Sequence, residues 1–181
     1  SVQQLLLMSR LLFKCDMLAA QVKEKFAGSG EDANAKLGSE QHTFGSRLLH
    51  LIFSLQSFVR QFSNALNSCS PEQFLEMGTL YQEMSQQERS IDFYVELLRK
   101  DQLDENVQLE ALEKSANYFG CMYASQFKDT VNGVWLLTDQ ARALLAAGDG
   151  LILLSNRVQS MMQVARSLYM YRRCTSLLGN T

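Results

Sequence analysis

The stretch LYQEMSQQERSIDFYVELLRKDQLDENV, residues 80–107, decides the fold because it holds one complete helix with its start and its end. Ser85 and Glu88 have the spacing of a capping box, in which each side chain satisfies a backbone N–H of the first turn. Four apolar residues then recur with the spacing of one helical face: Ile91, Tyr94, Val95 and Leu98. We therefore predict a helix from Ser85 to about Lys100, followed by an acidic turn at Asp101–Glu105.

Charge is distributed unevenly along the chain. The 181 residues have a net charge of −2, which is too small to draw the whole protein toward nucleic acid or an anionic membrane. Residues 80–107 carry seven acids and three bases, whereas residues 151–181 carry four arginines and no acid. We treat these two segments as candidate complementary surfaces.

The remaining sequence also predicts helices, since it contains a single proline and few strand-like alternations. Ser70, Pro71 and Gln73 have the pattern of a capped helix start. Further helices are expected at about 2–26 and 42–68, and from an Asp104 N-cap to about Phe127. The short connections predict an all-α fold, an elongated antiparallel bundle of about six helices. We expect a single domain, residues 1–181, with a flexible glycine-containing loop at about 27–41.

The last third of the chain predicts a helical hairpin. Gly148-Asp149-Gly150 is a typical turn sequence between arms at about 130–146 and 151–178. Six residues of the second arm have coiled-coil spacing and form the 151–168 seam: Leu151, Leu154, Val158, Met161, Ala165 and Leu168. We expect this seam to pack against the first arm. The alternative is pairing with a second chain, which would make the protein a self-associating scaffold.

Several strings resemble the family of large, Glued-type dynactin subunits, in the intercoiled domain between their two long coiled coils. They are LY-x-EM at 80–84, S-x-x-ERS at 85–90, DF at 92–93, ELL at 96–98, KDQLDE at 100–105 and LLLM-x-RL at 5–11. The chain opens and stops within its helical patterns, so we expect a fragment of a longer protein.

The resemblance implies a helical interaction and spacer module in a cofactor of cytoplasmic dynein. Such a protein supports minus-end-directed transport along microtubules, in the cytoplasm and on the cytoskeleton. The implied partners are dynein, other dynactin components, cargo adaptors and the flanking coiled coils of the same protein. The resemblance also allows a homodimer of the full-length protein.

Residues that could carry catalysis are sparse. His42 and His50 are the only histidines, and neither stands in a metal-binding motif. The four cysteines are widely spaced within apolar helical patterns, which favours free buried thiols in a reducing compartment. The apolar run Leu5–Leu12 is far shorter than the roughly 20 residues of a membrane span. We predict no enzyme activity, no cofactor, no metal and no membrane insertion.

Two groups of residues are candidate partner-binding sites. The first is the acidic turn: Asp101, Gln102, Leu103, Asp104 and Glu105. Leu103 is either a contact for a partner or part of a simple helix connector. The second group is Arg166, Arg172 and Arg173, which alternate with tyrosines as in some nucleic-acid-binding surfaces. Cations near a helix C-terminus also suit the helix dipole, so we expect no nucleic acid there.

Overall fold

The computed structural model describes residues 2–27, 35–127 and 133–178, and within these ranges it contains six α-helices and no strand. The helices are α1 (Val2–Ala27), α2 (Ala35–Ser68), α3 (Pro71–Thr79), α4 (Tyr81–Arg99), α5 (Glu110–Gln126) and α6 (Gly133–Leu178). The predicted all-α fold is confirmed. None of the described helices is both long and apolar enough to cross a membrane.

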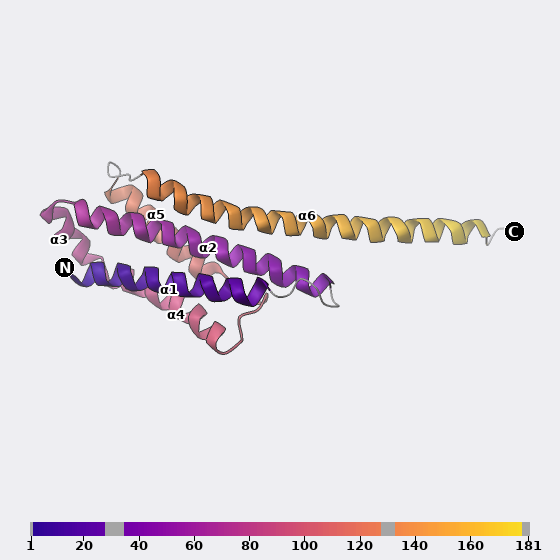
Figure 1. Cartoon of the computed structure of the whole chain (residues 1–181), viewed down its shortest axis with the longest axis horizontal. Helices are drawn as coiled ribbons and strands as arrows, with labels where there is room; N and C mark the ends of the chain where they lie inside the picture. Colours follow the sequence, from indigo (N-terminus) through magenta and orange to yellow (C-terminus); the bar gives the residue numbers. More distant parts are fainter. Residues whose placement is uncertain (1, 28–34, 128–132, 179–181) are drawn as a thin grey trace.

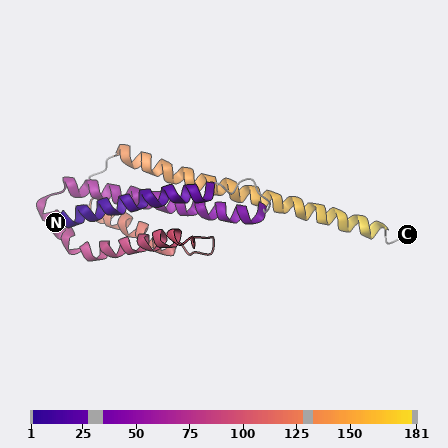
Figure 2. The same cartoon turned by 60° about the horizontal axis from the view of Figure 1, so that its bottom comes forward.

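Helix α2 is the centre of the bundle, because α1, α5 and α6 all pack against it. Gln56 of α2 bonds Asp16 of α1, and the rings of Phe44 and Phe26 meet further along, so these two helices are antiparallel. Helix α6 also runs antiparallel to α2, whereas α4 runs parallel to α1 (Figure 1). The bundle is elongated, and the C-terminal part of α6 extends beyond the other helices (Figure 2).

The predicted apolar faces form the core. All five residues of the expected α1 face are buried: Leu11, Cys15, Leu18, Val22 and Phe26. In α2, Phe62 is fully buried and meets two rings edge-on, Phe119 at 6.0 Å and Phe127 at 5.5 Å between centroids. Each large side chain of this kind contributes about 1.5–3 kcal/mol when it is fully buried.

The capping box of α3 is confirmed. The Ser70 hydroxyl accepts a hydrogen bond from the Gln73 N–H, and the Gln73 side chain accepts one from the Ser70 N–H, both at 3.3 Å. Pro71 occupies the first helical position, where no N–H partner is needed.

The predicted start of the next helix is wrong. Helix α4 begins at Tyr81 rather than Ser85, and its N-cap, Leu80, makes no side-chain capping bond. Ser85 and Glu88 lie inside the helix, where Glu88 pairs with α1 instead of capping a terminus. The longer helix buries Met84 completely, which compensates for the missing cap.

Two further boundaries differ from the prediction. Helix α5 begins at Glu110, and Asp104 caps a local turn instead, since its Oδ1 accepts a hydrogen bond from the Asn106 N–H at 3.0 Å. Helix α2 begins at Ala35 rather than near His42, consistent with good helix formers at its start. Residues 28–34 of the predicted flexible loop lie outside the described residues.

The predicted C-terminal hairpin is also wrong, because α6 is one continuous helix through Gly148-Asp149-Gly150. No glycine in the described part of the chain has a positive φ, so none takes the turn conformation that only glycine adopts easily. A Cβ on Gly150 would lie 3.3 Å from the Ser46 Cβ, so this glycine permits close packing on α2. With 46 residues, α6 is roughly 70 Å long.

Candidate interaction surfaces

The acidic turn begins where α4 ends. The Gln102 N–H reaches the Leu97 carbonyl at 2.8 Å and the Asp101 N–H reaches the Leu98 carbonyl at 3.1 Å, the two bonds of a Schellman motif. Asp101 takes the left-handed conformation that the motif requires, with φ of 55°. Its carboxylate accepts a hydrogen bond from Lys25 of α1 at 2.6 Å, which lowers the pKa of Asp101. This exposed ion pair links the turn to the end of α1.

Leu103 is part of the core rather than an exposed contact. Its side chain is 1% exposed, and the Tyr94 hydroxyl secures the same connection by donating to the Gln108 carbonyl at 2.8 Å. Gln102 and Asp104 are exposed, and Glu105 is half-buried. Asp101, Gln102 and Asp104 are thus the accessible part of the predicted site, and the role of the acidic turn in partner binding stays a prediction.

The predicted arginines lie on α6, away from the acidic turn. Arg166 and Arg172 are exposed, and Arg173 belongs to α6, although its side chain is outside the described ones. Both views place this part of α6 beyond the bundle, whereas the acidic turn follows α4 on the other side of α1 (Figures 1 and 2). Within one chain, the structure does not bring the two candidate surfaces together.

Helix α6 turns its small and polar side toward α2. Asp139 is 3% exposed and pairs with Arg60 at 3.4 Å, and the His50 Nδ1 lies 2.9 Å from the Ala143 carbonyl oxygen. Further along, Arg157 pairs with Glu40. Between residues 137 and 172, where the side chains of α6 are described, the buried apolar residues are Ala143 and Ala146. This part of the interface therefore depends on close backbone approach and polar contacts rather than on large apolar side chains.

The opposite side of α6 is apolar and exposed. We call the following residues the outer face of α6: Leu137, Leu144, Leu151, Val158, Met162 and Tyr169. They recur at seven, seven, seven, four and seven residues, so they share one side of the helix. Their side chains are 54–72% exposed. The predicted hairpin places Leu137 and Leu144 on the inward side of its first arm, and this prediction is wrong, because both side chains are exposed.

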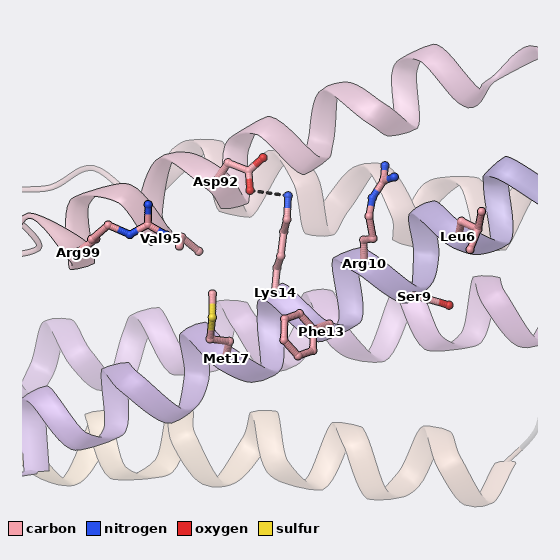
Figure 3. A pocket seen from close by; sticks show the side chains of 9 residues that line it. All are labelled: Leu6, Ser9, Arg10, Phe13, Lys14, Met17, Asp92, Val95 and Arg99. Carbon is pink, nitrogen blue, oxygen red and sulfur yellow. Dashed lines mark ion pairs between the residues drawn. The ribbon is translucent and has the colours of Figure 1, made fainter.

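A groove of about 500 Å³ lies between α1 and α4. It is lined by Leu6, Ser9, Arg10, Phe13, Lys14, Met17, Asp92, Val95 and Arg99, and Figure 3 shows Lys14 reaching across it to Asp92. Leu6 is 56% and Phe13 is 69% exposed, so α1 presents apolar residues on its outer side as well as in the core.

A charged cluster holds the two helices beside this groove. The Glu88 carboxylate accepts hydrogen bonds from Arg10 at 2.9 and 3.1 Å and from Lys14 at 2.8 Å. Burial acts to raise the pKa of Glu88, but the bonds from Arg10 and Lys14 outweigh it, so the pKa lies below its ordinary value. Glu88 is therefore ionised and holds α4 against α1.

The described residues contain no group of three or more histidine, cysteine or acidic side chains that could hold a metal ion. Glu40 is engaged by Arg157, and His50 contacts the backbone of α6. Cys15, Cys69 and Cys121 are free thiols, of which Cys121 is exposed, contrary to the expectation of burial. Burial raises the pKa of the Cys15 thiol to about 12, which leaves it protonated and unreactive.

Comparison with known proteins identifies the family. The family model described as "Dynactin: Dynein associated protein" matches residues 1–174. Dynactin subunit 1 of Gallus gallus is 42% identical over 125 residues, which cover 66% of this chain and 10% of that protein. The Xenopus laevis protein of the same name is 40% identical over 129 residues, which cover 69% of this chain and 10% of that protein.

Dynactin subunit 1 of Drosophila melanogaster is 34% identical over 158 residues, or 84% of this chain and 12% of that protein. The chain thus spans about a tenth of the length of these relatives. A family match over almost the whole chain, supported by these identities, shows that the chain belongs to the dynactin family of dynein-associated proteins.

Proposed function

We propose that the chain is a non-catalytic interaction and spacer module of a dynactin large subunit. In this role it supports dynein-driven, minus-end-directed transport along microtubules in the cytoplasm. The bundle would orient the flanking coiled coils and present surfaces to dynein, to dynactin components or to cargo adaptors. The relatives named Dynactin subunit 1 support the assignment to this complex.

One observation carries the spacer role, namely the projection of α6 from the bundle. Every described residue from Val158 to Arg172 is exposed, whereas Arg157 still contacts Glu40 of α2. A helix that is anchored at one end and solvent-exposed along the rest holds its side chains at a fixed distance and direction from the bundle. This is the geometry that a spacer needs.

The test uses insertions after Ser160 in the projecting part of α6. Two added alanines rotate the distal helix by about 200° relative to the bundle, whereas seven added residues restore the original orientation to within about 20°. We expect purified dynein and dynactin components to co-purify with the tagged wild-type chain and with the seven-residue insertion. The two-residue insertion should lose them. Equal retention by both insertions would contradict the orienting role.

A second candidate function is self-association through the 151–168 seam. The observation in its favour is that all six seam residues are exposed. Sedimentation equilibrium over a hundredfold range of protein concentration tests it. A concentration-dependent dimer that Val158→Glu abolishes would support this function, and a monomer at every concentration would exclude it for this chain.

A further inference from the structure

The eight methionines of the chain divide into two groups by exposure. Five belong to the bundle, where they are buried or half-buried: Met8, Met17, Met77, Met84 and Met122. The other three are 55–62% exposed and lie on α6: Met161, Met162 and Met170. We call residues 158–172 of α6 the projecting arm. Every exposed methionine of the chain therefore stands in the projecting arm, beyond the bundle (Figure 2).

Exposure decides which methionine sulfurs a dissolved oxidant can reach. Hydrogen peroxide oxidises a methionine thioether to the sulfoxide. The sulfur lone pair attacks one peroxide oxygen, the S–O bond forms as the O–O bond breaks, and the other oxygen leaves as water. The sulfur loses two electrons and the peroxide gains them. Met8, Met77 and Met84 are at most 1% exposed, so the core shields them from this reaction.

The exposed sulfurs stand on the apolar surfaces of the projecting arm. Met161 belongs to the 151–168 seam, and Met162 belongs to the outer face of α6. Met170 follows Met161 by nine residues, or about two and a half turns, so it lies on the opposite side of the helix. Because a sulfoxide is polar, oxidation would place polar groups on several sides of the arm. The effect does not depend on which side a partner covers.

We propose that Met161, Met162 and Met170 form an oxidation site, at which hydrogen peroxide converts the projecting arm from an apolar surface into a polar one and releases its partners. The proposal rests on the proposed interaction module and adds a means of regulating it. Methionine sulfoxide reductases reverse the change, since in their reaction the sulfoxide oxygen leaves as water and two thiols form a disulfide.

The first measurement locates the oxidation. The whole 181-residue protein is treated with hydrogen peroxide, and mass spectrometry of its tryptic peptides follows each sulfoxide over time. We expect the three arm methionines to be oxidised at least tenfold faster than the three core methionines. Retention of the intact protein on a hydrophobic phenyl column should shorten in parallel. A thiol reductant added after the peroxide reverses disulfides and sulfenic acid at the exposed Cys121 and leaves the sulfoxides.

The second measurement tests the effect on binding. Purified dynein and dynactin components are co-purified with the tagged chain before peroxide, after peroxide, and after repair by a methionine sulfoxide reductase. We expect the oxidised wild type to retain at least tenfold less of them, and the reductase to restore the original amount.

Two variants assign the effect to the projecting arm. Met161→Leu, Met162→Leu and Met170→Leu together keep apolar side chains of similar volume, so this triple variant should bind partners both before and after peroxide. The matched control is Met17→Leu combined with Met122→Leu in the bundle. It should lose binding after peroxide as the wild type does.

Four outcomes would overturn the proposal. They are equal oxidation rates in the arm and the core, an unchanged column retention of the oxidised wild type, undiminished binding by the oxidised wild type, and an equal loss of binding in the triple leucine variant. The proposed function fails separately, when the unoxidised wild type retains no dynein or dynactin component. The oxidation rates and the column retention then still decide whether the arm is an oxidation site.

Discussion

Lys14 of α1 donates a hydrogen bond over 2.8 Å to the carboxylate of Glu88, 74 residues later in the chain on α4. The Arg10 guanidinium binds the same carboxylate with two nitrogens. The Glu88 side chain is 11% exposed and the Arg10 side chain 53%, so solvent screens the carboxylate weakly and the guanidinium more strongly. It fixes the position of α4 along α1 and hence the shape of the groove between them.

Replacing Glu88 with alanine should destabilise the bundle. The change leaves Lys14 and Arg10 without their shared acceptor, and we expect a loss of about 2 kcal/mol in the free energy of unfolding. Urea denaturation followed by circular dichroism measures it. The matched control is Glu113→Ala at an exposed position of α5, which should change stability by less than about 0.5 kcal/mol. Equal losses in the two variants would contradict a structural role for the cluster.

The same cluster predicts how stability depends on pH. The pKa of Glu88 is lower in the folded protein, so the unfolded chain binds a proton more readily. The stabilisation that the ionised Glu88 provides is therefore complete above about pH 4.3, the ordinary pKa of a glutamate in an unfolded chain. It is lost as the pH falls through the lower pKa that Glu88 has in the folded protein. We expect the wild type and Glu88→Gln to differ most near pH 7 and to converge toward pH 3. A constant difference in the urea midpoint across this range would argue against the assignment.

Gly148 distinguishes a continuous α6 from a hairpin. A Cβ at Gly148 would meet no atom within 4 Å, so Gly148→Ala should raise the free energy of unfolding by roughly 0.5–1 kcal/mol in a helix. If Gly148 lay in a turn with a positive φ instead, the same substitution would lower the free energy of unfolding. Gly45→Ala is the contrasting variant, since its Cβ would lie 2.8 Å from the Phe26 Cγ and should destabilise the protein. Thermal unfolding of both variants measures the difference.

Leu103→Ala should behave as a core mutation, although the residue stands among acids in the sequence. We expect a loss of about 2–4 kcal/mol, because its buried side chain leaves a cavity. Gln102→Ala, its exposed neighbour, should be nearly neutral. Chemical denaturation provides the comparison, and a stable Leu103→Ala protein that has lost only partner binding would restore the exposed-contact interpretation.

Local sequence rules predicted the apolar faces well, because burial follows directly from helical spacing. The faces of α1 and of α4 around Ile91 and Tyr94 are buried as expected. Capping rules were less decisive, because a serine followed three residues later by an acid or an amide can cap a helix or can lie inside one. At Ser70 and Gln73 it caps α3, whereas at Ser85 and Glu88 it lies within a helix and one member pairs with α1.

Long-range packing decided the features that the sequence could not specify. Gly148-Asp149-Gly150 has the composition of a turn, but the neighbouring α2 allows these residues to remain helical, with Gly150 close to Ser46. Likewise, the apolar residues of the 151–168 seam predicted burial, yet these residues are exposed and no helix among the described ranges covers them. The 151–168 seam was therefore recognisable from the sequence as an apolar pattern, whereas its exposure required the structure.

The unbroken α6 also has a mechanical consequence. The projecting segment from Val158 to Arg172 acts as a lever arm of roughly 20 Å, pivoting where α6 leaves α2. A sideways load at its tip concentrates torque on the Arg157–Glu40 pair, the outermost of the three polar contacts described between α2 and α6. Such a load would break the contacts one after another, first Arg157–Glu40, then His50–Ala143 and last Arg60–Asp139. A pull along the axis would instead strain all three at once, so the joint resists tension better than bending.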